Sequence, residues 1–331
     1  MKLSQLILTV FLLGMISPTL GIWEDASAET KAAMVKKTHE ALERVETMFA
    51  ERGYPFERPV IESGRAQRYS APDNKNDTLD IYVPLVLNVR FRPANLEIFH
   101  FSNTMLRRKV DSEGSQLRIF PEKHQPKLSE DEVIEIAKEF VTAVFGKFPT
   151  NVSRPKARWE TNYGLADIPG KGSVRGYQHG MWRIHFPRVT EEGYPFSSAG
   201  ESVMVEFYEN VGPVFVNNQM ITQFDKVDFE PLKLEDVLDT ARTRAKEVMK
   251  WKPVREAFEG LELDPEPFRA NLEVVRPNHL TKRRSIAGDG GDIKGRLAWV
   301  IWFSCPPSQK RVVGVWIDAE NKKFLGGDLG I

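Results

Sequence analysis

A short strand pattern occurs twice in this chain and constrains its fold more than any other feature. The segments MWRIHF (181–186) and AWVIWF (298–303) share the form Trp-x-Ile-x-Phe. Because the side chains of a β-strand point alternately to opposite faces, each pattern puts three large apolar residues on one face of a sheet. The sequence therefore predicts two equivalent strands, each with one buried face.

A helix pattern precedes each of these strands and a hairpin pattern follows it. Residues 128–146 and 232–251 have apolar residues at helical spacing, and Ser129 with Glu132 forms a capping box. Alternating apolar residues flank a short turn in 203–218 and again in 313–327. The shared order of helix, strand, long loop and three further strands predicts that one α+β unit has been duplicated.

Residues 29–112 have a related but weaker pattern. A helix pattern covers 29–53 and a hairpin pattern covers 89–103, but Pro84 interrupts the stretch that must supply the middle strands. This segment is either a degenerate copy that lacks a strand or no copy at all. We expect an α+β fold of tandem units, in each of which one helix packs on an antiparallel β-sheet. The predicted divisions are a signal peptide at 1–28, a degenerate unit at 29–112, and units at 125–225 and 229–331.

The two later units resemble PepSY-type (peptidase propeptide-like) domains. The match lies in the helix LSEDEVIEIAKEFV, the Trp-initiated strand and the closing hairpin VGVWIDAENKKFLGG. The family's hairpin reads roughly V-x-V-D-A-x-T/N-G-x-V-L. Here the residues that match it are Val315, Ile317, Asp318, Ala319, Asn321 and Leu325, and Lys322 stands where the family usually has Gly. The middle hairpin, VEFYENVGPVFV, lacks the Asp-Ala pair.

The resemblance covers about 125–331 and only faintly the first unit. It implies one helix on antiparallel strands and a protein partner, because such domains are associated with propeptides of secreted metallopeptidases. They are thought to restrain peptidase activity or to bind envelope proteins. From the residues alone, an Asp placed before a turn can accept hydrogen bonds from nearby backbone N–H groups, so we expect Asp318 to be structural.

The first residues have the form of an export signal. Lys2 precedes an apolar run at 6–13 that has signal-peptide length and is too short to span a bilayer. Cleavage fits after Gly21, with Thr19 at the −3 position, or after Ala28, with Ala26 at −3. We expect an exported protein that is periplasmic, on the cell surface or secreted, with no membrane span in the mature chain. A retained, buried N-terminal helix is the alternative.

Charge and cysteine content narrow the functional classes. The 46 basic and 46 acidic residues cancel, which argues against a nucleic-acid-binding role. The lone Cys305 cannot form an intramolecular disulfide, and we expect a buried structural thiol. The six histidines show no H-x-x-x-H or H-x-H spacing, and no phosphate-binding, dinucleotide-binding or nucleophile-elbow motif occurs.

We therefore expect no metal or cofactor and favour a non-catalytic binding module, although enzyme activity stays open. One alternative is a secreted hydrolase that uses carboxylates brought together between units, for which Glu191 and Glu192 are candidates. Another is a structural envelope protein whose repeats act as spacers.

Two long loops are the predicted binding surface. They occupy equivalent places, between the first and second strands of the two later units, at 162–180 and 277–295. Long loops on a rigid sheet commonly carry binding residues. Basic and aromatic residues suited to an interface are Tyr163, Arg175, Tyr177 and His179 in the first loop and Lys282, Arg283 and Arg284 in the second. The alternative is that both loops are plain surface insertions.

Overall fold

The structure is a computed structural model in which the chain forms two compact units. The first comprises 1–148, 156–185 and 204–218, and the second comprises 149–155, 186–203 and 219–331. The structure describes residues 22–62, 64–70, 77–106, 125–161, 163–168, 172–177, 180–197, 202–218, 224, 227–251, 255–276, 286–287 and 294–330. Of the predicted signal peptide at 1–28, residues 1–21 lie outside the described residues, whereas residues 22–28 are described.

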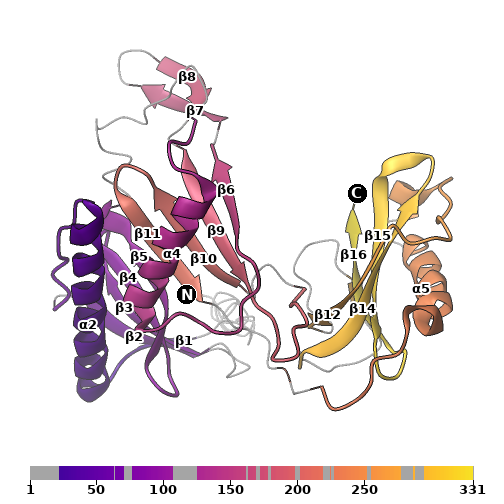
Figure 1. Cartoon of the computed structure of the whole chain (residues 1–331), viewed down its shortest axis with the longest axis horizontal. Coiled ribbons are helices and arrows are strands. Elements are labelled where there is room, and N and C mark those ends of the chain that lie inside the picture. Colours follow the sequence, from indigo (N-terminus) through magenta and orange to yellow (C-terminus); the bar gives the residue numbers. More distant parts are fainter. Residues whose placement is uncertain are drawn as a thin grey trace, which may run out of the picture. The chain divides into compact units, whose positions relative to one another are not determined.

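A nine-stranded sheet forms the body of the first unit (Figure 1). Its strand order is β1-β2-β3-β4-β5-β11-β10-β9-β6. In chain order the strands are β1 (Ile22–Asp25), β2 (Arg65–Ser70), β3 (Thr78–Val83), β4 (Leu87–Arg92), β5 (Glu97–Asn103), β6 (Lys156–Glu160), β9 (Met181–Pro187), β10 (Ser202–Tyr208) and β11 (Gly212–Asn218). The pairings from β1 to β5, between β5 and β11 and between β6 and β9 are antiparallel.

Two helices, α2 (Ala28–Arg52) and α4 (Glu130–Phe145), cover one face of this sheet. Phe140 of α4 packs against Phe101 of β5, with ring centroids 5.9 Å apart, and against Phe49 of α2 at 6.4 Å. The capping box is confirmed, because the Ser129 N–H donates to Glu132 Oε2 at 2.8 Å and the Glu132 N–H donates to Ser129 Oγ at 3.3 Å.

The predicted buried strand faces of the first sheet are also confirmed. The side chains of the Trp strand and of the following hairpin are at most 4% exposed; they are Trp182, Ile184, Phe186, Val203, Val205 and Phe207. The Trp182 indole N–H donates to Glu209 Oε1 at 3.1 Å. Glu209 also accepts the backbone N–H groups of Lys127 and Leu128, at 2.9 and 3.0 Å, just before α4. The Trp strand is therefore linked to the start of its helix.

The second unit contains a five-stranded sheet of order β12-β14-β15-β16-β13, with α5 (Leu234–Met249) on one face. Its strands are β12 (Arg269–Val275), β13 (Ile286–Ala287), β14 (Arg296–Cys305), β15 (Ser308–Asp318) and β16 (Phe324–Gly330), and a short 3₁₀ helix, η1 (Arg255–Phe258), follows α5. The Trp299 indole N–H donates to the Leu232 carbonyl at 2.8 Å, so this Trp strand is also linked to the residues before its helix.

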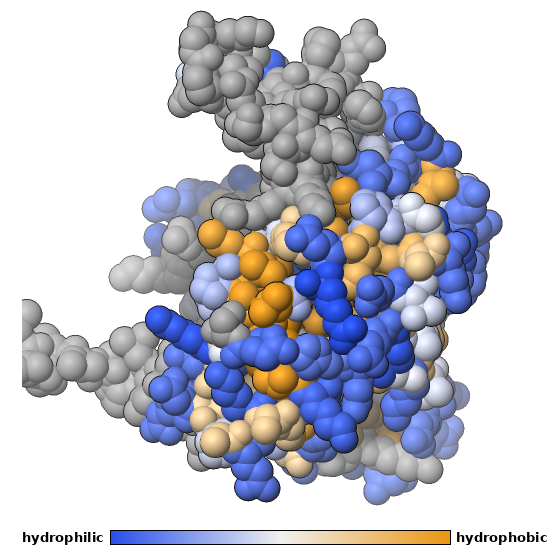
Figure 2. Space-filling view, turned by 90° about the vertical axis from the view of Figure 1, so that its left-hand side faces the viewer, coloured by the Kyte–Doolittle hydropathy of each residue, from blue (hydrophilic) through white to orange (hydrophobic). Residues whose placement is uncertain are grey.

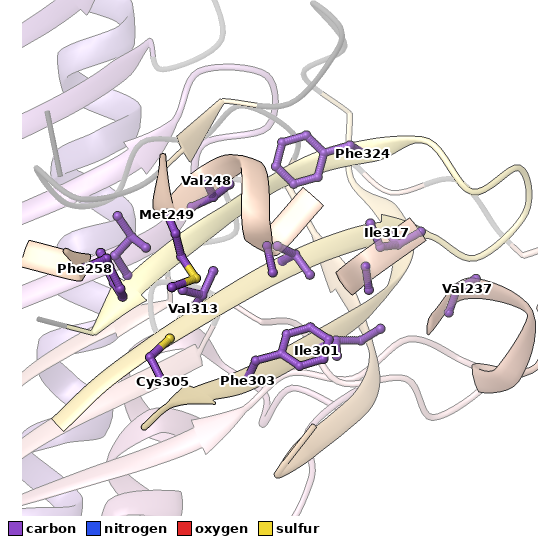
Figure 3. Packing of buried hydrophobic residues seen from close by; sticks show 14 residues of the cluster. Val237, Val248, Met249, Phe258, Ile301, Phe303, Cys305, Val313, Ile317 and Phe324 are labelled. Atoms are coloured by element: carbon purple, nitrogen blue, oxygen red, sulfur yellow. The ribbon is translucent and has the colours of Figure 1, made fainter. Parts of the chain in front are cut away.

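The core between α5 and this sheet matches the sequence pattern (Figure 3). Val237, Val248 and Met249 of α5 pack against Ile301 and Phe303 of β14 and against the alternating residues Val313, Val315 and Ile317 of β15. Cys305 is fully buried in the same cluster and is a free thiol. Burial raises the pKa of Cys305 to about 11, which keeps the thiol protonated and confirms the structural interpretation.

Each of the described helices α2, α4 and α5 is followed by at least four strands of one sheet, and five strands follow α5. We call α2 with β2 to β5 the first segment, α4 with β6 and β9 to β11 the middle segment, and α5 with β12 and β14 to β16 the last segment. The expectation that the first segment lacks a strand is wrong. Pro84 lies in the turn between β3 and β4 and does not interrupt a strand.

The fold is α+β with antiparallel sheets, as predicted, but separate tandem units are not confirmed. The first and middle segments share one sheet, because β11 pairs with β5 in the register Phe215↔Ser102, Val216↔Phe101 and Asn217↔His100. Only the last segment has a sheet of its own. The boundaries 29–112, 125–225 and 229–331 stay predictions.

The closing hairpin turns of the first and last segments are built alike. The Leu96 N–H donates to the Arg92 carbonyl at 2.9 Å, and the Lys322 N–H donates to the Asp318 carbonyl at 3.1 Å. Both Leu96 and Lys322 have positive φ, at 51° and 64°. Asp318 Oδ1 accepts the N–H groups of Glu320 and Asn321 at 2.8 and 3.2 Å, so its predicted structural role is confirmed.

Candidate binding surfaces

The first of the two predicted binding loops forms a β-hairpin of its own. Strand β7 (Tyr163–Ile168) pairs antiparallel with β8 (Gly172–Tyr177) in a two-stranded sheet. We call residues 163–177 the β7–β8 arm. Glu160 of β6 pairs with Met181 of β9, so the arm extends from the end of that strand pair, at the top of Figure 1.

Three of the predicted binding residues lie in this arm. Tyr163 and Tyr177 are directly opposite each other in the register, and Arg175 is opposite Leu165. Arg175 is exposed to solvent. His179 lies outside the described residues. The arrangement brings Tyr163, Arg175 and Tyr177 within one hairpin.

The second predicted loop has a different structure from the first. Its described part contains β13, which pairs with β16 in the register Ile286↔Gly327 and Ala287↔Gly326. Strand β13 thereby lies at the opposite edge of the five-stranded sheet from β12. Lys282, Arg283 and Arg284 lie outside the described residues, so their predicted role stays a prediction.

A row of polar residues crosses the face of the nine-stranded sheet opposite the helices, and the sequence analysis missed it. Seven neighbouring strands, from β3 to β6 in the sheet order, contribute one residue each. We call this row the polar belt: Asp80, Arg90, His100, Asn217, Glu206, Arg183 and Glu160. The strand register places Asp80 opposite Arg90, Arg90 opposite His100, and His100 opposite Asn217.

Most charges of the polar belt are paired. Arg90 Nε lies 3.3 Å from Asp80 Oδ2, and Arg183 lies 2.7 Å from a Glu160 oxygen and 3.4 Å from a Glu206 oxygen. Burial raises the pKa of Asp80, and the Arg90 charge partly offsets this shift. The Asp80 side chain is only 6% exposed. Asp80 Oδ1 and Arg183 Nε are buried and have no hydrogen-bond partner within the described residues, and ordered water commonly fills such positions.

His100 is the uncharged centre of the polar belt at neutral pH. Burial, and after it the positive charge of Arg90, lowers the pKa of His100 to about 4. Its ring packs edge-on against Phe215, with centroids 5.0 Å apart, and its side chain hydrogen-bonds to Asn217. The belt can therefore offer hydrogen bonds and paired charges, with little net charge of its own.

The described residues contain no group of three or more His, Cys, Asp and Glu residues placed to hold a metal ion. Glu191 and Glu192, the carboxylates suggested for a hydrolase, lie in an exposed turn that the Gly193 N–H closes on the Thr190 carbonyl at 3.0 Å. On the side shown in Figure 2, hydrophilic residues surround a small group of apolar ones. Within the described chain, no helix is long and apolar enough to cross a membrane.

Comparisons with known proteins give a distant structural likeness. No protein-family model matches the chain, and no curated protein matches it either. A solved structure, the Bacillus megaterium YpeB C-terminal domain, aligns over 93% of this chain and 99% of that chain. The TM-score is 0.36 and the sequence identity is 9%, so this likeness carries no argument about function. The PepSY resemblance therefore rests on the sequence motifs.

Proposed function

We propose that this protein is an exported binding module that engages a protein partner through the β7–β8 arm. The observation that supports it is the arm itself, a two-stranded hairpin outside both larger sheets that carries exposed Arg175. A two-stranded hairpin is marginally stable in water on its own, because it buries little apolar surface. Packing against a partner would supply the missing burial.

The composition of the arm suits an interface. Tyrosine and arginine are enriched at the centre of protein–protein contacts, and Tyr163, Tyr177 and Arg175 bring both kinds together on paired strands. In the two-stranded sheet each strand has one partner, so an extended segment of another protein can add to an outer edge. Export is supported by the apolar run at 6–13, and a secreted peptidase as partner is supported by the PepSY resemblance.

We further propose that the three segments are copies of one PepSY-like unit. The support is the shared order of a helix and four strands, together with the matching turns at 92–97 and 318–323. In both turns an Asn side chain accepts the N–H two residues later, Asn95 from Glu97 and Asn321 from Lys323, each at 3.0 Å. In this proposal, fusion of the first and middle sheets followed duplication.

The test of binding is site-specific photo-crosslinking in the cells that export the protein. A photoreactive residue replaces Arg175 in the arm or, as a matched control, Arg158, an exposed arginine of β6 in the same unit. We expect a discrete adduct from position 175 and none from position 158. Adducts at both positions, or at neither, would contradict binding through the arm, and the absence of any adduct is what a spacer role predicts.

A shortened variant gives an independent measurement. Because Glu160 and Met181 are already paired, an Asn-Gly turn can replace residues 161–180 without changing the β6–β9 register. We expect the variant to keep the circular dichroism spectrum of the wild type. We expect it no longer to capture or inhibit the partner identified by crosslinking. Unchanged association with that partner would place recognition elsewhere, with the polar belt the next surface to examine.

A further inference from the structure

Strand β1 belongs to the folded sheet although it lies within the predicted signal peptide at 1–28. Its four residues, IWED, pair with β2 in the register Ile22↔Ser70, Trp23↔Tyr69, Glu24↔Arg68 and Asp25↔Gln67. The Ala26 N–H continues this pairing by donating to the Ala66 carbonyl at 2.9 Å. The sheet therefore uses the chain from Ile22 onward.

Ser27 then starts helix α2. Its Oγ accepts the Thr30 N–H at 3.2 Å, and its carbonyl accepts the Lys31 N–H at 2.8 Å, which begins the helical hydrogen bonding. Glu29 adds a negative charge in the first turn, where the helix dipole favours it. Residues 22–29 thus contribute a strand, a helix cap and a favourable charge to the fold.

The two cleavage positions that fit the sequence have opposite effects on these residues. Cleavage after Ala28 would remove β1 and the Ser27 cap, and it would place a new ammonium group on Glu29, at the positive end of the helix dipole. Cleavage after Gly21 would keep all of them. Gly21 also lies closer to the apolar run at 6–13, as a signal-peptide cleavage site requires.

We infer that the export signal is cleaved between Gly21 and Ile22, so that the mature chain begins with the first residue of β1. This inference rests on the export part of the proposed function. The step is hydrolysis by the exporting cell's signal peptidase. Water adds across the Gly21–Ile22 peptide bond, Gly21 keeps the new carboxylate, and Ile22 becomes the new amino terminus.

The test is the intact mass and N-terminal sequence of the protein recovered outside the cytoplasm. The expected product is residues 22–331. A product that begins at Glu29 would overturn the inference and leave export standing, whereas a chain that stays in the cytoplasm with Met1 would refute both.

Matched variants separate the two positions. Gly21→Leu puts a large residue at the position that needs a small one, and is expected to block or displace cleavage. Ala28→Leu places a good helix former at an exposed first-turn position and is expected to give the wild-type product. The reverse pattern would overturn the inference.

Two purified chains, residues 22–331 and residues 29–331, test the structural reason for preferring cleavage after Gly21. We expect residues 29–331 to melt at a temperature several degrees below that of residues 22–331, because they lack β1 and the Ser27 cap. Equal melting temperatures would remove the physical reason for preferring Gly21.

Discussion

The middle and last segments have the same order of helix and strands, but they complete their sheets in different ways. The middle segment pairs β11 with β5 of the first segment and leaves its long insertion as the separate β7–β8 arm. Within the five-stranded sheet, the last segment pairs with itself and with its own insertion, which adds β13 beside β16, and a parallel bridge joins Val274 of β12 to Phe196. Insertions at equivalent positions in the two segments therefore adopt different structures. The edge of β11 is occupied by β5, whereas the edge of β16 pairs with β13 of the insertion.

The largest expected difference between these segments is whether each folds alone. Residues 227–331 contain α5, the whole five-stranded sheet and its helix-facing core, so we expect a cooperative thermal transition. Residues 125–218 expose β11 where β5 would pair, and we expect them to aggregate or to lack such a transition. Calorimetry of the two fragments is the measurement. A cooperative transition in the middle fragment would show that the shared sheet is dispensable.

Removing either signature tryptophan should destabilise its own sheet strongly. Trp182→Ala and Trp299→Ala each delete a large apolar side chain, which typically costs about 3–5 kcal/mol. We expect the larger loss at Trp182, which is 4% exposed, since Trp299 is only partly buried. Chemical denaturation of the full chain measures both. Two silent substitutions would refute the packing of these strands.

Low pH should destabilise the first unit through His100, a partly buried histidine of a kind that the strands of the five-stranded sheet lack. The pKa of His100 is about 4 in the folded protein and ordinarily about 6.5, so the unfolded state takes up the proton first as pH falls. This contribution to stability is present above pH 6.5 and is lost as pH falls toward 4, by up to about 3 kcal/mol. Asp80, whose pKa is raised, acts in the opposite direction.

The control for this prediction is His100→Gln, which cannot take up a proton at this position. We expect the free energy of unfolding, measured by denaturation at several pH values between 4 and 7, to change less with pH in the variant than in the wild type. If it changes equally with pH in both proteins, His100 is not the cause.

The smallest expected effects concern the residues with positive φ in the closing turns. Lys322→Gly should stabilise the last segment by up to about 1 kcal/mol, because φ is 64° there and glycine adopts this conformation without a Cβ clash. Gly212→Ala should destabilise the middle segment by about 1–2 kcal/mol, because φ is 90° and an added Cβ would lie 3.1 Å from Phe49 and Tyr54. Melting temperatures that shift in the reverse directions would contradict the assignment of these turns.

Local patterns in the sequence predicted the local structure well. The capping box at Ser129, the buried alternation from Val313 to Ile317 and the Asp318 turn each depend on residues near one another in the chain. The number of strands in the first segment did not follow from its sequence, because a proline fits a turn between two short strands as well as it breaks one long strand.

The shared sheet and the candidate surfaces could be predicted only in part. Periodicity identifies which face of β5 is buried, but it does not show which distant strand meets its edge, so the pairing with β11 was not found. The polar alternation around Asp80 and Arg90 is visible in the sequence, yet the polar belt exists only after that pairing forms. The frequent glycines of residues 164–176 obscured the strand pattern of the arm.

The pairing of β5 with β11 also has a consequence for the order in which the chain is made. Strand β5 is complete at Asn103, but β11 begins only at Gly212, so a growing or translocating chain carries an open edge while the whole middle segment follows. An open strand edge is a template for pairing between molecules, and long-range pairing slows folding. In the five-stranded sheet, by contrast, β14, β15 and β16 are consecutive neighbours. Aggregation during biogenesis should therefore begin at β5.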